Sequence, residues 1–298
     1  MLKKIKNKVK AAIHYGLKDL QSKAWQSTVS SQEIQVLLKL KFKEYSNQSL
    51  SDLPTFDEVG FKAYSQFEED GILLYIFSMI GSTNKKVVEI CAGDGKECMA
   101  ANLIINHGWE GYLFDGSTEN VQKGHDFFLK HKQTFLMPPT FKQAWFTAEN
   151  INSILKDTGV KGEIDLLSLD IDGMDYWVWQ AIDYIQPRVC IFETHNVIPA
   201  NLSLTAKYDA NFYYLNQPAE QQDYRSASLL AMKNLSEKKG YRLIGCHRHG
   251  FNCFFMRNDI GQSYFPKVSV ESCHNNSYTR AAQQNRWTIV KDLDWQEV

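Results

Sequence analysis

The chain has 298 residues, of which 44% are hydrophobic and 13% aromatic, enough to build a sizeable core and to exclude disorder over most of its length. It holds 33 lysines and arginines against 34 aspartates and glutamates, and the formal net charge of -1 argues against a nucleic-acid-binding protein. The charge is unevenly spread, because residues 1–20 hold six lysines and one aspartate, a local charge of +5 that leaves -6 for the rest.

Six cysteines are scattered along the chain, and no two of them form a Cys-x-x-Cys pair. A chain of this size needs no disulfides for a stable core, so we expect reduced thiols and a cytoplasmic protein. No apolar run approaches the roughly 20 residues that span a bilayer, and no apolar segment follows the basic N-terminus as a secretion signal requires. We therefore expect neither a membrane-spanning helix nor an export signal.

Residues 1–60 are expected to form a helical extension. Apolar residues recur at helical spacing among the first lysines, namely Leu2, Ile5, Val9 and Ile13. Such a helix could make a peripheral contact with an anionic membrane surface. The interpretation that we favour is a solvated helix whose narrow apolar stripe packs on the main domain or on a second subunit of a homo-oligomer. The stretch 46–54, rich in Ser, Asn and Asp, is typical of a linker.

Strand-like and helix-like segments alternate from about residue 65 onward, as they do in parallel α/β sheets. Strands are expected at 86–91, 111–115, 141–146, 164–170, 189–193, 241–246 and 251–256, and helices at 99–105, 118–132, 150–156, 175–185 and 228–239. The last two strands flank a short turn and should pair as a hairpin, whereas ordinary dinucleotide-binding domains continue as parallel units. The expected domains are the extension 1–60, the main domain 61–260 and a C-terminal extension 261–298.

The first expected strand ends in a glycine turn that could bring a nucleotide-like ligand close to the backbone. The turn contains Glu89, Cys91, Ala92, Gly93 and Gly95. Asp115, followed by Gly116, ends the second strand about one β-α-β unit later, where a carboxylate can accept hydrogen bonds from both ribose hydroxyls. These residues fit a site for adenosine, either in S-adenosylmethionine (SAM) or in NAD.

Two features favour SAM over NAD. The loop 93–97 lacks the third glycine and the phosphate-cradling geometry that a pyrophosphate requires. Phe146 and Ala148, after the third strand, could supply an apolar face for adenine, although both could equally be core residues.

Acidic residues are densest at the end of the fourth strand, where open α/β sheets place their ligands. Asp170 and Asp172 emerge at alternate positions, and such neighbouring acids repel one another unless they share a proton or a cation. One could accept a proton from a hydroxyl, and others could ligate Mg²⁺. Asp175 is expected only to begin the next helix. Glu193 and His195 close the fifth strand and should face the same pocket, His195 as a base, a metal ligand or a polar loop residue.

Five segments together resemble the FkbM-like SAM-dependent methyltransferases over residues 60–260. They are Ser65–Gly71, Glu89–Gly95, Asp115–Gly116, Asp170–Gly173 and Gly250–Phe255. The pattern departs from the family at Cys91, where a glycine is usual. The resemblance implies the class I fold, a Rossmann-like sheet of seven mostly parallel strands with an antiparallel last strand.

The resemblance also implies roles for individual residues. Gln66 and Asp70 would lie beside the cofactor, and Glu89 and Asp115 would bind SAM. The turn that begins at Asp170 would border the acceptor.

The activity that the resemblance implies is transfer of a methyl group to a hydroxyl of a sugar, nucleotide-sugar or glycoconjugate of surface polysaccharide synthesis. Asp172 is expected to accept the hydroxyl proton, with His195 as the alternative base. Related sugar O-methyltransferases pair a metal-binding aspartate on the fourth strand with acids after the fifth. Asp170, Glu193 and His195 are therefore candidate ligands for Mg²⁺ or another divalent metal.

The acceptor is expected to contact the segment 195–224. Its aromatic residues, which suit stacking on a sugar or a nucleobase, are Tyr208, Phe212, Tyr213 and Tyr214. Arg225 and Arg248 could bind a phosphate of the acceptor, although such residues more often pack a loop.

Two other functions stay open on the sequence. An NAD-dependent oxidoreductase or epimerase would share the glycine turn and Asp115, but it would need a hydride-transfer apparatus such as a Tyr-x-x-x-Lys pair in a suitable helix. A non-catalytic partner protein that kept the fold would use the basic N-terminal helix as its working surface.

Overall fold

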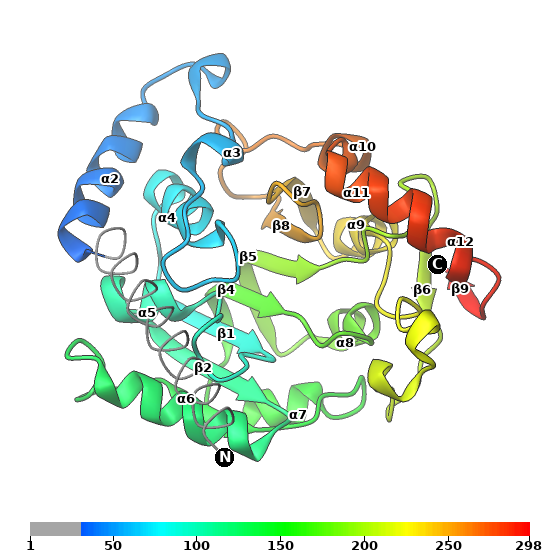
Figure 1. Cartoon of the computed structure of the whole chain (residues 1–298). Helices are drawn as coiled ribbons and strands as arrows, with labels where there is room; N and C mark the ends of the chain where they lie inside the picture. Colours follow the sequence, from blue (N-terminus) through cyan, green and yellow to red (C-terminus); the bar gives the residue numbers. More distant parts are fainter. Residues whose placement is uncertain (1–30) are drawn as a thin grey trace, which may run out of the picture.

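One seven-stranded sheet organises the protein, whose computed structural model describes residues 31–298 (Figure 1). The strands lie in the order β3-β2-β1-β4-β5-β8-β7. They are β1 Lys86–Ile90, β2 Glu110–Asp115, β3 Thr140–Gln143, β4 Gly162–Leu169, β5 Ile185–Glu193, β7 Tyr241–Cys246 and β8 Asn252–Arg257. β8 runs antiparallel to β5 and β7, and the other neighbours are parallel. The predicted Rossmann-like sheet with an antiparallel last strand is confirmed.

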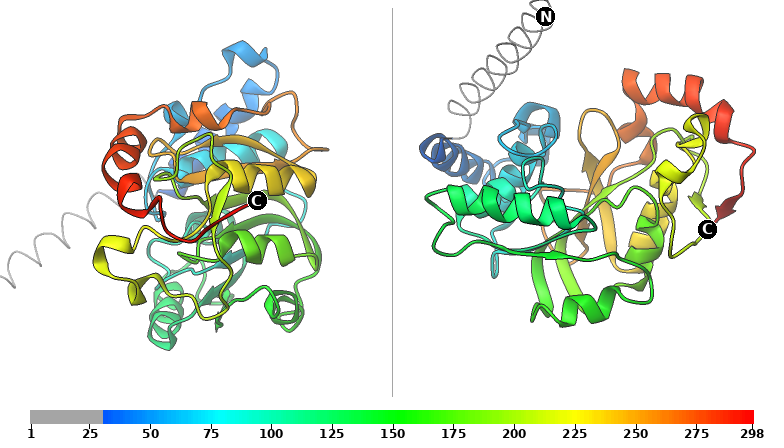
Figure 2. Two further views of the ribbon diagram at one scale, coloured as in Figure 1. Left: turned by 90° about the vertical axis from the view of Figure 1, so that its right-hand side faces the viewer. Right: turned by 60° about the horizontal axis from the view of Figure 1, so that its bottom comes forward.

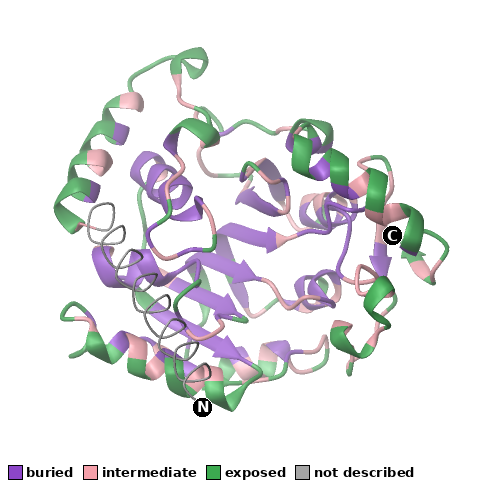
Figure 3. Ribbon diagram, viewed as in Figure 1, coloured by how far each residue is buried: buried purple, intermediate pink, exposed green. Residues whose placement is uncertain are grey.

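The central strands are apolar along their length because helices cover both faces of the sheet (Figure 3). Successive side chains of a strand point to opposite faces, so Val87 joins one core and Val88 the other. The first core lies under α4 Glu69–Ile80, α5 Ala101–His107 and α6 Thr118–Lys130. The second lies under α7 Ile151–Lys156, α8 Asp175–Ala181 and α9 Leu229–Lys238.

Two further segments flank the sheet and its helices. On the N-terminal side, α2 Gln32–Tyr45 lies against α4, and η1 Leu50–Asp52 and α3 Phe56–Val59 follow it. On the C-terminal side are α10 Val270–His274, α11 Ser277–Ala282, η4 Gln283–Trp287, α12 Thr288–Val290 and β9 Trp295–Glu297, the last paired with β6 Leu204–Ala206. The remaining short helical turns are η2 Tyr214–Asn216 and η3 Ala219–Gln221.

Part of the predicted N-terminal extension lies outside the described residues. This part includes the apolar stripe of Leu2, Ile5, Val9 and Ile13. Over residues 31–298, no helix combines the length and the apolar character needed to cross a bilayer.

Two predicted elements end three or more residues earlier than expected. The helix expected over 175–185 stops at Ala181, because the N–H groups of Asp183 and Tyr184 donate to the side-chain oxygen of Asn152 and not to the helix. Ile185 then begins β5. The strand expected over 141–146 ends at Gln143, and residues 144–146, which follow it, line a cavity.

A buried ion pair ties together the beginnings of three strands. Asp165 of β4 accepts a hydrogen bond from Nη1 of Arg188 in β5 at 2.6 Å. The same carboxylate accepts the N–H groups of residues 83–85, just ahead of β1, at 2.6–3.0 Å. Both side chains are buried, so the charge of Arg188 is balanced locally and not by water.

Replacing Asp165 should test how much this ion pair stabilises the fold. We expect Asp165→Asn to lower the free energy of unfolding by about 3 kcal/mol or more, because Arg188 would stay charged and buried without an anionic partner. Glu163→Gln on the same strand is the control, since the pair of Glu163 with Arg257 is partly exposed and should contribute no more than about 1 kcal/mol. Urea unfolding measures both variants, and equal losses would contradict this account.

Candidate functional site

Two neighbouring cavities lie at the edge of the sheet where β1, β2, β3 and β4 end. Their volumes are about 420 and about 440 Å³, and Cys91 lines both. The first is also lined by Asp115, Gly116, Phe146 and Asp172, and the second by Gln66, Ala92, Gly93 and Asp170. Open α/β sheets bind their ligands at this edge. Of the predicted strand-end acids, Asp115, Asp170 and Asp172 line these cavities. Glu89 and Glu193 line neither of them.

The loop after β1 contains three residues in the left-handed backbone region. Gly93 and Gly95 have φ angles of 57° and 81°, and Cys91 has a φ angle of 69°. A Cβ at Gly95 would lie only 3.1 Å from the ring of Phe128. The left-handed region costs a residue with a Cβ roughly 1–2 kcal/mol. The left-handed conformation of Cys91 explains why the family pattern has a glycine at this position.

Two acids that the resemblance links to the cofactor lie behind the cavity walls and bind backbone groups. Glu89 accepts the N–H groups of Met99 and Ala100 at 2.8 and 2.7 Å, just ahead of α5. Burial raises the pKa of Glu89 to about 7, although these donors act in the opposite direction. Asp70 accepts the N–H groups of residues 63–65 at 2.6–2.8 Å and so fixes the loop that carries Gln66 to the second cavity.

Asp115 is the acid that reaches the first cavity. One carboxylate oxygen accepts the N–H of Gly93 at 3.0 Å. The other accepts the N–H of Ser117 at 2.8 Å and the side-chain amide of Asn120 at 3.0 Å. Ser117 and Asn120 also line the cavity but were not predicted. Ser117 is the N-cap of α6, and a serine just after a strand-end acid is the signal that could have identified it.

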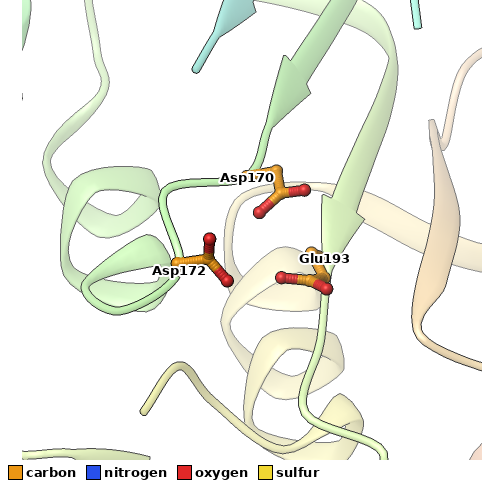
Figure 4. A group of neighbouring side chains, drawn as sticks. All are labelled: Asp170, Asp172 and Glu193. Carbon is orange, nitrogen blue, oxygen red and sulfur yellow. The ribbon is translucent and has the colours of Figure 1, made fainter. Parts of the chain in front are cut away.

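Three carboxylates form an acid cluster at the ends of β4 and β5, namely Asp170, Asp172 and Glu193 (Figure 4). Oxygen atoms from all three lie within 4.8 Å of one another. Burial, followed by the charges of Glu193 and Asp172, raises the pKa of Asp170 well above its usual range. Burial and the charge of Asp172 raise the pKa of Glu193 to about 7. Asp170 and Glu193 lie close enough to repel each other when both are ionised, so each carboxyl group binds a proton more readily than a free one does.

Arg225 supplies the positive charge of the acid cluster. Its guanidinium group forms an ion pair with Asp172 and lies over the ring of Tyr214, 4.6 Å from the ring centroid. Arg225 is predicted from the sequence as a residue that could bind a phosphate of the acceptor. No sequence signal links Arg225 to Asp172, which lies 53 positions away in the chain. Arg248, the other candidate for a phosphate, pairs with Glu68 at 2.9 Å.

The acid cluster offers the oxygen ligands that Mg²⁺ prefers, at a spacing that one ion could bridge. Arg225 already pairs with Asp172, however, and burial favours the neutral forms of Asp170 and Glu193. A metal would have to compete with Arg225 for Asp172 and with protons for the other two acids. The divalent metal stays a prediction from the sequence.

The structure leaves His195 outside the acid cluster. His195 is buried, and its Nε2–H donates to the backbone oxygen of Asp223 at 2.7 Å. Burial and the charge of Arg225 lower the pKa of His195 to about 4, which keeps the ring neutral. Asp175 begins α8, as expected, and accepts the N–H groups of Ile171 and Gly173.

Aromatic side chains from the segment 195–224 form one wall of the first cavity. They are Phe212, Tyr213 and Tyr214. Trp145, which was not predicted, joins this wall, and its indole N–H donates to the backbone oxygen of Ala210 at 3.0 Å. Two predicted residues, Tyr208 and Ala148, do not line the cavity. They contact each other instead, because the Tyr208 hydroxyl accepts the N–H of Ala148 at 3.1 Å.

No protein-family model matches the sequence, and no curated protein matches it either. Among solved structures, the chain is similar to an S-adenosylmethionine-dependent methyltransferase from Clostridium acetobutylicum ATCC 824, with 11% identity, 72% of this chain and 96% of that chain covered, and a TM-score of 0.41. It is also similar to the O-methyltransferase from Bacillus cereus in complex with SAH, with 11% identity, 78% and 94% covered, and a TM-score of 0.41. The strand order of the sheet, and not these low scores, identifies the class I methyltransferase fold.

The neutral state of His195 predicts a specific pH dependence of stability. The folded protein holds this histidine with a pKa of about 4, below the usual 6.5, so the unfolded chain binds its proton more readily. The neutral His195 ring therefore contributes to the free energy of unfolding near neutral pH, and this contribution is lost as the pH falls from about 6.5 toward 4.

Between pH 6.5 and pH 5, we expect the free energy of unfolding to fall by about 1.5 kcal/mol more in wild type than in His195→Gln. Urea unfolding at both pH values measures it, and the comparison with wild type cancels the contributions of other buried acids. The same pH dependence in both proteins would show that His195 is protonated in the folded state.

Proposed function

We propose that this protein transfers a methyl group from SAM to a hydroxyl group of a small molecule. The observation that carries the proposal is the pair of cavities that meet at Cys91, with Asp115 on the wall of the first and Asp170 on the wall of the second. This arrangement provides a carboxylate for a ribose, a glycine turn that lets a ligand approach the backbone, and acids beside the junction of the two cavities.

We place the adenosine part of SAM in the first cavity and its amino-acid part in the second. Asp115 would bind the ribose hydroxyls, and Phe146 would contact the adenine. Gln66 and Gly93 would line the amino-acid part. The positively charged sulfonium would then lie near Asp170, where negative charge from the acid cluster favours a cation.

The start of α5 argues against NAD. In dinucleotide-binding domains, the pyrophosphate binds N–H groups at the helix that follows the glycine turn. Here α5 begins only at Ala101, and Glu89 accepts the N–H groups just ahead of it. A carboxylate in that position takes up the donors and would repel a phosphate, whereas SAM carries no phosphate.

Methyl transfer needs alignment, exclusion of water and a place for the hydroxyl proton. The acceptor oxygen forms a bond to the methyl carbon as the bond from that carbon to sulfur breaks, and the electron pair stays on sulfur. The hydroxyl proton passes to Asp172, which lines the first cavity. Arg225 holds this carboxylate in place, and no step requires a metal.

We propose a sugar, nucleotide-sugar or glycoconjugate as the acceptor. The support is the FkbM-like sequence pattern together with the aromatic wall of Trp145, Tyr213 and Tyr214, because flat rings stack well on sugars and bases. We also propose that the reaction takes place in the cytoplasm, since all six cysteines are free thiols.

Calorimetry with S-adenosylhomocysteine and with NAD tests the cofactor. We expect binding of the first and not of the second, and an affinity at least about tenfold weaker in Asp115→Asn, which loses a charged acceptor for the ribose. Asp126→Asn, at an exposed position on α6, is the control and should bind as wild type does. Binding of NAD alone would favour an oxidoreductase, and binding of neither compound would favour a non-catalytic partner protein.

Asp172→Asn tests the proton acceptor. We expect methyl transfer to fall by roughly 100-fold or more, because an amide cannot take the hydroxyl proton, while affinity for S-adenosylhomocysteine stays nearly unchanged. Mass spectrometry after incubation with SAM and a panel of nucleotide-linked sugars measures the transfer. Asp183→Asn, at an exposed site, is the control. Wild-type turnover in Asp172→Asn would remove Asp172 from the mechanism.

A further inference from the structure

Exposed apolar side chains gather on two elements far from the cavities. Within residues 31–298, eight of the fourteen exposed large hydrophobic residues lie on α2 or in the segment 129–137. They are Ile34, Val36, Leu37, Leu40, Leu129, Phe135, Leu136 and Met137. We call these residues the amino-edge surface, because both elements adjoin the edge at which the strands begin. A surface of this kind usually marks an interaction site.

The most exposed part of the amino-edge surface is a tripeptide in the loop between α6 and β3. Phe135 is 51% exposed, Leu136 80% and Met137 86%. Hydrogen bonds hold the loop, because the N–H groups of Thr134 and Phe135 donate to His131 O at 3.1 and 3.0 Å. The Thr134 hydroxyl donates to Phe128 O at 2.5 Å and is buried. The loop therefore presents three consecutive apolar side chains from an ordered turn.

α2 carries apolar side chains on its outer face as well as on the face that packs against the core. Its polar residue Gln35 is fully buried and exchanges hydrogen bonds of 2.9 Å with Asn102, whereas Leu37 is 66% exposed. Only a few apolar residues of α2, such as Phe42 against Tyr75, face the core. Burial inside the described protein cannot explain the leucines on the outer face.

The two elements lie on the same side of the molecule. The side chain of Gln32 in α2 donates to the backbone oxygen of Asn106 at 2.8 Å, and Asn106 lies just before β2 in the chain. The loop 131–139 leads into β3, the strand that pairs with β2. Figure 1 shows both at the left, and the right-hand view of Figure 2 agrees. The cavities lie at the opposite edge, where the strands end, so contact through the amino-edge surface leaves them open.

Positive charge surrounds the amino-edge surface. Five lysines lie on its elements, at positions 39, 41, 43, 130 and 132, against the two acids Glu33 and Glu44 of α2. In the sequence, residues 1–20 ahead of α2 carry a further charge of +5. Exposed apolar side chains with lysines on the same elements match the chemistry of an anionic lipid surface. Two copies of the chain would instead bring like charges together.

We propose that the amino-edge surface docks the protein on an anionic membrane surface, with Phe135, Leu136 and Met137 entering the boundary between headgroups and acyl chains. The lysines contribute attraction to anionic headgroups, and the apolar side chains contribute burial. This docking does not depend on the proposed methyl transfer.

Sedimentation of the full chain with lipid vesicles tests the proposal. We expect binding to vesicles of phosphatidylcholine with about 30% phosphatidylglycerol, little binding to phosphatidylcholine alone, and weaker binding as salt is added. The double variant Leu136→Ser/Met137→Ser should bind at least about tenfold more weakly, because it buries less apolar area. Leu37→Ser/Leu40→Ser should also weaken binding, which tests α2 separately.

Ile289→Ser is the matched control, because Ile289 is 52% exposed but lies on α12. It should bind vesicles as wild type does, and near-UV circular dichroism checks that each variant is folded. Absence of vesicle binding, or equal losses in Ile289→Ser, would overturn the proposal. The proposal would also be overturned if light scattering detected a dimer that the α2 substitutions dissociate and wild type did not bind vesicles.

Discussion

The candidate site depends on the reversal of strand order between β1 and β4. From β1 the sheet extends through β2 to β3 on one side, and through β4 to β5 on the other. The connections that leave β1 and β4 therefore diverge, and a crevice stays open between them. The loop 91–95, Asp115 and Asp170 reach this crevice from three different strands. Local changes in a single loop could not create it.

Acids that meet at strand ends must be balanced, because like charges in a partly buried site repel. The structure balances them in different ways. Asp115 accepts backbone and side-chain N–H groups, burial favours the neutral forms of Asp170 and Glu193, and Asp172 pairs with Arg225. Arg225 balances the charge of one of the three carboxyl groups in the acid cluster. The cluster therefore fits the proposed cationic methyl donor better than the phosphates of NAD.

The opposite edge of the sheet has a different character. There the strands begin, Asp165 and Arg188 hold three of them together, and the amino-edge surface faces outward. A molecule docked through that surface would present its cavities to the aqueous side. The two edges can therefore serve separate purposes, since the rigid sheet between them keeps them apart.

Local patterns predicted much of the fold. The strand over 241–246 has the expected bounds, and most other strands differ by one or two residues, because apolar runs and turn residues are local signals. The early end of α8 was not predictable in this way, since it depends on Asn152 in another helix. Trp145 was missed for a similar reason, because its contact is with Ala210.

The sequence by itself determined the succession of the seven sheet strands and of the helices α5 to α9 along the chain, the glycine turn after β1 and the acids that end the strands. Only the tertiary structure decided what those acids contact. It placed Glu89 against the backbone, Asp115 on a cavity wall, and Arg225 beside Asp172. The physical reason is that periodicity and turn chemistry act over a few residues, whereas the charge and hydrogen bonding of a side chain depend on groups that folding brings from distant positions.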